Sequence, residues 1–185
     1  MRINKTKAKL AANQSVVGAG IAFPSPDLVE LCAVVGFDFI TIDAEHEAMN
    51  EEQIVHMIRA AESFDITPIV RLPRNPDLIL HFLNAGAQGI HVPRCTRADD
   101  LRELVKWTRF HPQGERTFYN RGRSGNFSVG VTDTAEWSRA ANRELLVIAM
   151  VEEVKALDNL DEILAVPYVD AIHVGHMDLW QSMGM

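Results

Sequence analysis

Cysteine is scarce in this chain of 185 residues, which contains only Cys32 and Cys95. Two cysteines cannot build a disulfide framework, so we expect a reducing compartment and place the protein in the cytoplasm. Long hydrophobic runs are missing as well, and no apolar segment is long enough to span a membrane. The basic segment 1–10 is followed by no apolar signal core, and we therefore expect no membrane partner.

Positively charged residues are also fewer than negatively charged ones. Lysine and arginine together number 18 against 25 aspartates and glutamates, which gives a formal net charge of −7. This balance argues against nucleic acid as a partner, because phosphate binding depends on lysine and arginine. Hydrophobic residues make up 47% and charged residues 23% of the chain, as in ordinary globular proteins, and we treat residues 1–185 as a single domain.

Six short apolar segments alternate with segments of helical spacing. This order predicts an α/β fold with a parallel sheet covered by helices, either an open doubly wound sheet or a (β/α) barrel. No glycine-rich dinucleotide fingerprint follows the first strand, which lowers the weight of the doubly wound Rossmann type. The predicted strands are Val16–Phe23, Phe37–Asp43, Ile66–Arg71, Gly89–Val92, Leu145–Val151 and Asp170–Val174.

Capping residues mark where several helices begin. Ser25, Asn50, Asn75 and Thr96 each precede a helical pattern and can accept hydrogen bonds from the first free backbone N–H groups. Residues 111–144 interrupt the alternation with several glycines and arginines, and long loops of this kind are usually functional or disordered. Within them, residues 134–142 could form a short extra helix.

Polar side chains gather just after the predicted strands, where parallel α/β folds collect their chemistry. They are Asp43, Glu45 and His46 after the second strand, Arg71 at the end of the third, Glu152 and Glu153 after the fifth, and His176 and Asp178 after the sixth. Packing does not readily explain them, because the strands before them are apolar. Taken singly, His46 could be an ordinary surface histidine and Arg71 could simply pair with an acid.

Glu152 and Asp178 form the most informative pair. Two carboxylates from neighbouring strand ends can hold one hard cation, such as Mg²⁺ or Mn²⁺, and leave positions for water and substrate. One alternative is two separate solvated acids, and another is a zinc cluster of His173, His176 and Asp178.

Lysine is absent from the predicted strands. The five lysines are Lys5, Lys7, Lys9, Lys106 and Lys155. A Schiff-base aldolase needs a lysine inside its site. If this chain acts on a carbonyl compound, activation by a metal ion is therefore the better hypothesis.

Six stretches in order carry a resemblance to a known family. They are IDAEH at 42–46, VRLP at 70–73, NAGAQGIHVPRC at 84–95, HPQGERTF at 111–118, MVEE at 150–153 and DEILAVPYVDAIHVGHMDLWQSMG at 161–184. With these motifs the chain resembles the HpcH/HpaI aldolase family, within the pyruvate and phosphoenolpyruvate barrel superfamily. The resemblance covers nearly the whole chain and implies a (β/α)8 TIM barrel.

The resemblance implies a metal-dependent class II aldolase that cleaves or forms 4-hydroxy-2-oxo acids, with pyruvate as the enolate partner of an aldehyde. Glu152 and Asp178 would hold Mg²⁺ or Mn²⁺, with Co²⁺ as a further option. Arg71 would bind the keto oxygen, and His46, oriented by Asp43, would serve the acid–base step. The backbone before Asp178, at Met177, would receive the pyruvate carboxylate. A homo-oligomer, either a dimer or a hexamer, is also implied.

Departures from the family pattern leave alternatives open. Asn84 stands where Asp is common, Met150 where Gln is common, and His176-Met177 replaces a proline and a small residue. A TIM barrel typically needs about 250 residues, so with six strands we expect a barrel truncated before it closes. The alternatives are a lyase acting on a CoA thioester, with the Arg116–Arg123 loop as its only candidate cleft, and a truncated, non-catalytic barrel fragment.

Overall fold

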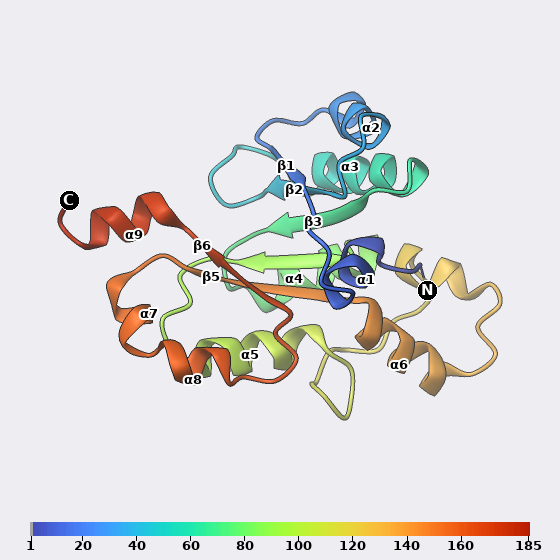
Figure 1. The fold of residues 1–185 in the computed structure, drawn as a ribbon. Helices are drawn as coiled ribbons and strands as arrows, with labels where there is room; N and C mark the ends of the chain where they lie inside the picture. Colours follow the sequence, from blue (N-terminus) through green and yellow to red (C-terminus); the bar gives the residue numbers. More distant parts are fainter. Residues whose placement is uncertain (1) are drawn as a thin grey trace.

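The computed structural model describes residues 2–185 and contains one six-stranded parallel sheet. The strands follow one another in chain order, which confirms the predicted strands and excludes the reversal of order that defines a doubly wound sheet. The sheet is curled into a half-barrel (Figure 1), which is consistent with the predicted TIM-type architecture. The strands are β1 (Gly18–Ile21), β2 (Phe39–Asp43), β3 (Thr67–Arg71), β4 (Gly89–Val92), β5 (Leu146–Val151) and β6 (Ala171–Val174).

Helices cover the outer face of the curled sheet (Figure 1). They are α2 (Pro26–Val34), α3 (Glu51–Ser63), α4 (Pro76–Ala85), α5 (Ala98–Thr108), α7 (Val154–Asp158) and α8 (Leu160–Leu164). The long loop contains the 3₁₀ turn η1 (Arg123–Ser128) and α6 (Thr134–Glu144), which packs against Phe110 in a separate small cluster. No helix of residues 2–185 is long and apolar enough to cross a membrane.

The predicted caps are confirmed at three of four helices. Ser25 Oγ accepts the N–H of Leu28, Asn50 forms a reciprocal capping box, and Asn75 Oδ1 accepts two N–H groups at the start of α4. The prediction for Thr96 is wrong, because α5 begins at Ala98 and no side chain at Thr96 caps it. Instead the Asp100 carboxylate accepts a hydrogen bond from the backbone N–H of Thr96 at 2.9 Å.

Two short helices at the ends of the sheet were not foreseen, and neither was α7. Helix α1 (Lys5–Ala11) lies across the end of the sheet where the strands begin, and α9 (His176–Ser182) follows β6 at the opposite end (Figure 1). Polar contacts hold α1 in place. The fully buried Asn4 donates from Nδ2 to the carbonyl of Gln88 at 3.0 Å, and Thr6 Oγ1 donates to Thr67 Oγ1 at 2.8 Å.

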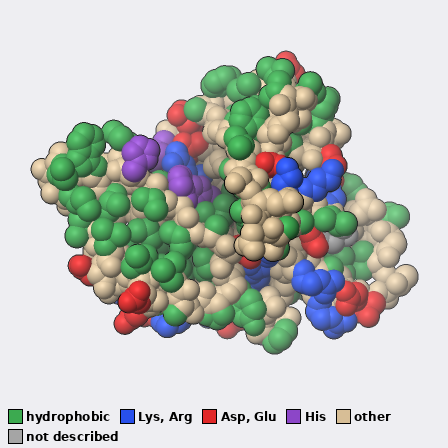
Figure 2. Space-filling model, viewed as in Figure 1, with side chains coloured by type: hydrophobic (Ala, Val, Ile, Leu, Met, Phe, Trp, Pro, Cys, Tyr) green, Lys and Arg blue, Asp and Glu red, His purple; other side chains and the backbone are tan. Residues whose placement is uncertain are grey.

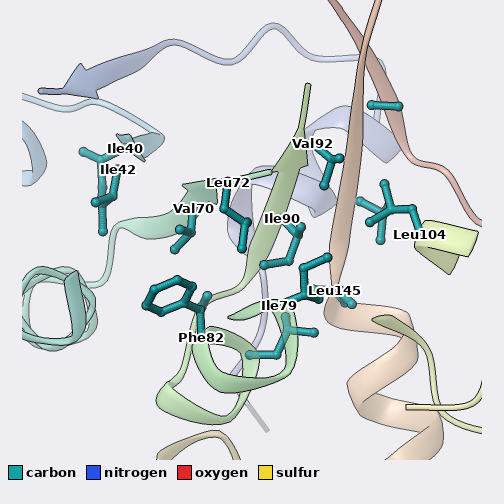
Figure 3. Close-up of a cluster of buried hydrophobic side chains, with 14 of the residues drawn as sticks. Ile40, Ile42, Val70, Leu72, Ile79, Phe82, Ile90, Val92, Leu104 and Leu145 are labelled. Carbon is teal, nitrogen blue, oxygen red and sulfur yellow. The ribbon is translucent and has the colours of Figure 1, made fainter. Parts of the chain in front are cut away.

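Alternation along the strands decides which residues reach the concave face. Ile40 and Ile42 of β2, Val70 of β3 and Ile90 of β4 pack outward against helical residues such as Phe82 (Figure 3). Successive side chains of a strand point to opposite faces, so the residues between and beside them point inward. The inward set comprises Thr41 and Asp43 of β2, Ile69 and Arg71 of β3 and His91 of β4. The polar ends of three neighbouring strands thus face one interior.

An ion-pair network is centred on Asp170, just before the start of β6. Asp170 accepts the Arg109 guanidinium at 2.7 Å, the Lys7 ammonium at 2.8 Å and the backbone N–H of Val147 at 2.7 Å. Arg109 is only 2% exposed and also donates to the Tyr168 carbonyl at 2.8 Å. Burial lowers the pKa of both cations, and their contacts with Asp170 oppose that shift.

The long loop between α5 and β5 uses its arginines for internal contacts. Arg116 is buried with its guanidinium 4.6 Å from the Phe110 ring centroid, and it donates to Asn84 Oδ1 at 3.0 Å. Arg123 forms an ion pair with Glu62 of α3. These two arginines are therefore engaged in the fold and are poorly placed to line a basic cleft. The extra helix predicted at residues 134–142 is confirmed as α6.

Candidate active site

Two adjoining hollows lie on the concave side and at the C-terminal ends of the strands. The larger, of about 720 Å³, is the barrel interior, whose polar lining includes Asp43, Arg71, His91 and His173. The smaller, of about 310 Å³, lies beyond the strand ends. Its lining is Glu45, His46, Arg94, Glu152, Glu153, Asp178, Gln181 and Ser182. In Figure 2, histidines lie to the upper left of the centre of the viewed face, beside basic and acidic side chains.

Asp43 and Arg71 form a two-point ion pair across β2 and β3, where they are register partners. Arg71 Nε donates to Asp43 Oδ1 at 3.0 Å, and Nη2 donates to Oδ2. Burial acts to raise the pKa of Asp43, but the bonds from Arg71 and from two backbone N–H groups hold it below its usual value. The pair with Asp43 raises the pKa of Arg71. Both groups are therefore charged at neutral pH.

Asp43 also holds the loop that carries His46. Its Oδ1 accepts the backbone N–H groups of Glu45 at 3.0 Å and of His46 at 3.3 Å. The His46 imidazole is 59% exposed and places Nε2 at 3.5 Å from Glu45 Oε2. Within residues 2–185, Asp43 thus orients His46 through the backbone, whereas the ring itself faces Glu45. The acid–base role of His46 stays a prediction.

Carboxylates crowd the smaller hollow. Burial raises the pKa of Glu152, the nearby Asp178 and Glu45 raise it further, and the N–H of Arg94 offsets part of the effect. Gly175 makes this crowding possible, because a Cβ at its position would lie 2.7 Å from Glu152 Cβ. Negative groups that repel one another around one pocket are a suitable environment for a cation.

The donor set fits a hard divalent cation that keeps some of its water. Glu152 and Asp178 supply two carboxylates, and Mg²⁺ is usually held by one or two carboxylates together with water and substrate oxygens. No group of three or more His, Cys, Asp or Glu residues that could hold a metal is assembled within residues 2–185. The alternative zinc cluster of His173, His176 and Asp178 is therefore wrong. His173 points into the barrel from β6, whereas His176 and Asp178 belong to α9.

His91 and Arg94 lie at the site and were missed from the sequence. His91 Nε2 lies 3.1 Å from His173 Nδ1, in the barrel interior beside Arg71. Burial, followed by the charges of His173 and Arg71, lowers the pKa of His91 to about 3. The available sequence signal for His91 was its position as a polar residue inside the apolar strand GIHV. Arg94 donates its backbone N–H to Glu152 Oε1 at 2.7 Å, and its place two residues after β4 was the only hint.

We expect His91 to make the protein less stable in mild acid. Its folded pKa of about 3 lies below the ordinary histidine value near 6.5, so the unfolded chain binds a proton more readily. The stability contributed by neutral His91 is fully present above about pH 6.5. It falls as the pH drops toward 3, and the loss by pH 5 is about 2 kcal/mol.

Urea unfolding of the wild type and of His91→Leu at pH 8 and pH 5 measures this effect. The wild type should lose about 2 kcal/mol more than the variant between the two pH values. His173, whose pKa is also lowered by burial, is present in both proteins and does not account for the difference. Equal losses in the two proteins would show that His91 is not the group responsible.

Comparison with known proteins gives matches over nearly the whole chain. The model of the HpcH/HpaI aldolase/citrate lyase family matches residues 21–185. The hydroxypyruvate/pyruvate aldolase of Deinococcus radiodurans is 32% identical over 98% of this chain and 65% of its own length. This chain thus spans about two thirds of the length of that curated relative.

Solved structures match the fold as well. An HpcH/HpaI aldolase from Desulfitobacterium hafniense superimposes with a TM-score of 0.90 at 33% identity, covering 96% of this chain and 68% of that one. The citrate synthase SbnG matches with a TM-score of 0.85 at 36% identity, over 96% of this chain and 68% of its own. Together with the family match over residues 21–185, these likenesses show that the chain belongs to the HpcH/HpaI aldolase/citrate lyase family.

Proposed function

We propose that this chain carries the active site of a divalent-metal-dependent aldolase, a carbon–carbon lyase that cleaves or forms 4-hydroxy-2-oxo acids through a pyruvate enolate. The observation that carries the proposal is the meeting of Glu152 and Asp178 in one pocket beside the Arg71–Asp43 pair. Relatives named as aldolases support the reaction class. The substrates would be a small 2-oxo acid, pyruvate, and an aldehyde.

Glu152 and Asp178 would hold the cation, Mg²⁺ or Mn²⁺ with Co²⁺ as a further option. When bound, the ion supplies positive charge that lowers the energy of an enolate oxygen. Arg71 would donate to the same keto oxygen. Asp43 takes the N–H of Nε and one N–H of Nη2, so the two N–H groups of Nη1 and the second N–H of Nη2 remain for the substrate. A guanidinium held in this way needs no reorganisation as charge develops, which is the basis of electrostatic catalysis.

His46 would move the proton of the 4-hydroxyl group, which is the step that most needs a base, through a water molecule. Imidazole is the side chain that exchanges protons most readily near neutral pH. The exposed ring of His46 lines the same pocket as Glu152 and Asp178. The backbone before Asp178, at Met177, would receive the pyruvate carboxylate. A cytoplasmic location and a dimeric or hexameric assembly stay predictions.

A second candidate function is the formation of a carbon–carbon bond with an acceptor other than a simple aldehyde. The likeness to the citrate synthase SbnG at 36% identity favours this candidate. A lyase acting on a CoA thioester ranks lower, because Arg116 is buried and Arg123 is paired with Glu62. A non-catalytic fragment ranks lower as well, since its carboxylates would have no reason to be held together in one pocket.

The test is proton exchange at C3 of pyruvate in deuterated water. Purified protein is incubated with Mn²⁺ or Mg²⁺ and then with a chelator, while NMR follows the methyl proton signal. We expect exchange that requires the metal ion, because enolate formation releases a C3 proton whichever aldehyde is used. A folded, metal-loaded protein that exchanges no protons would contradict the aldolase proposal and favour the second candidate.

A further inference from the structure

Arg94 has an unusual backbone for a long side chain. It follows β4 and adopts a φ of +55°, in the left-handed region that non-glycine residues rarely enter. Such a conformation is energetically unfavourable and persists where the surrounding structure enforces it, often at functional sites. Arg94 lines the small pocket together with Glu45, Glu152 and Asp178.

The left-handed turn lets one residue contact two carboxylates. The backbone N–H of Arg94 donates to Glu152 Oε1 at 2.7 Å, and its guanidinium Nη2 donates to Glu45 Oε1 at 3.1 Å. The side chain is 62% exposed, so the backbone contact is the more sheltered of the two.

The two oxygens of Glu152 are consequently in different environments. Oε1 is taken by the N–H of Arg94 on the β4 side. Oε2 faces β6, where it lies 2.8 Å from the place a Cβ of Gly175 would occupy. Gly175 directly precedes α9, which carries Asp178, so Oε2 lies on the side of Glu152 where the second carboxylate begins its helix.

We propose that Arg94 is a positioning residue, whose N–H holds one oxygen of Glu152 so that the other oxygen is the one presented to a cation. This inference rests on the proposed metal site. A carboxylate limited to one oxygen suits Mg²⁺ or Mn²⁺, which take few protein ligands at short distances. It suits Ca²⁺ less well, because Ca²⁺ takes more oxygens at longer distances and often binds carboxylates through both. Arg94 thus contributes to metal selectivity as well as to affinity.

Two substitutions separate the backbone contact from the side-chain contact. Arg94→Asn removes the guanidinium from Glu45 but tolerates the left-handed conformation, so the N–H stays on Glu152. Arg94→Val also removes the guanidinium, but its β-branched side chain disfavours a positive φ and pulls the N–H away. Arg94→Ala disfavours that conformation more mildly and serves if the valine variant does not fold.

The experiment measures Mn²⁺ binding to the full chain by the EPR signal of free Mn²⁺, with Ca²⁺ as competitor and circular dichroism as the check of folding. We expect Arg94→Asn to bind Mn²⁺ within about threefold of the wild type, with the same preference over Ca²⁺. Arg94→Val should bind Mn²⁺ about tenfold more weakly, as is typical when a group that supports a metal ligand is lost. Its preference for Mn²⁺ over Ca²⁺ should also fall.

The outcomes distinguish this inference from the proposed function. Wild-type affinity and selectivity in a folded Arg94→Val, or in Arg94→Ala if valine does not fold, would overturn the role of Arg94 alone. Equal losses in the asparagine and valine variants would also overturn it, because the side chain would then be responsible. A wild type that binds no Mn²⁺ would remove the metal site and this inference together. A wild type that binds Mn²⁺ but exchanges no pyruvate protons would contradict only the aldolase reaction.

Discussion

Replacing Glu152 by glutamine should abolish metal-dependent proton exchange and at the same time make the metal-free protein more stable. The loss of exchange should be about 10³-fold or more, because a charged ligand of the cation disappears. The gain in stability follows from burial and from Asp178 and Glu45, which raise the pKa of Glu152 and make its ionised form costly. Removing that charge relieves the cost, by on the order of 1 kcal/mol.

The pH dependence of this gain has a definite sign. The pKa of Glu152 is raised on folding, so its ionisation lowers stability as the pH rises through the folded pKa. The advantage of Glu152→Gln should therefore be present at pH 7. It should vanish below the ordinary glutamate pKa of about 4.3, where the wild type is protonated in both states.

NMR exchange assays and urea unfolding measure the two effects on the same samples. Asp178→Asn should lose exchange in the same way, whereas Glu162→Gln, an exposed acid on α8 outside the pocket, should match the wild type in both assays. Exchange that survives in both Glu152→Gln and Asp178→Asn would refute the metal assignment. A loss of stability in metal-free Glu152→Gln would show that the carboxylate supports the fold.

Replacing Asp170 by alanine should lower the free energy of unfolding by about 3–5 kcal/mol at pH 7. Asp170 is the shared partner of the buried Arg109 and of Lys7, and its removal leaves these cations without their carboxylate. An uncompensated buried charge costs this much, whereas a missing pair need not. The N–H of Val147 at the start of β5 would lose its acceptor as well.

The size of the loss is tested by urea unfolding of a small set of variants. Asp170→Asn keeps an acceptor oxygen and should cost less than alanine. The double variant Arg109→Met, Asp170→Ala should recover part of the loss, because the buried charge is gone. The exposed Asp161→Ala on α8 is the matched control. A loss below about 1 kcal/mol for Asp170→Ala would place it among ordinary surface substitutions.

Local signals were sufficient for the strands and for most helix starts. Runs such as FDFITID and LLVIAMV are apolar and rich in β-branched residues, and they became β2 and β5 within two residues of the predicted bounds. Ser25, Asn50 and Asn75 cap helices through contacts within three residues. Such contacts depend on neighbours in the chain, which is why they can be read without a fold.

Helix α1 is an element that local sequence patterns were not sufficient to predict. Asn4 caps it by accepting the N–H of Lys7, but its seven residues carry three lysines and no acidic residue in the first turn, so the local signal for a helix is weak. Its position depends on distant partners. The backbone N–H of Asn4 donates to Glu144 at 2.7 Å, 140 residues away in the chain, and Lys7 reaches Asp170. Short helices are marginal without such tertiary contacts.

By itself, the sequence determined the order of strands and helices and placed acids and an arginine at the strand ends, because both follow from spacing along the chain. Only the tertiary structure decided the partners of those side chains. Asp43 pairs with Arg71 because parallel register sets β2 beside β3. His173 meets His91, and not a zinc site with His176, because both point to the concave face and the curl of the sheet brings β4 and β6 together across β5. Curvature acts on residues far apart in the chain, and no local pattern records it.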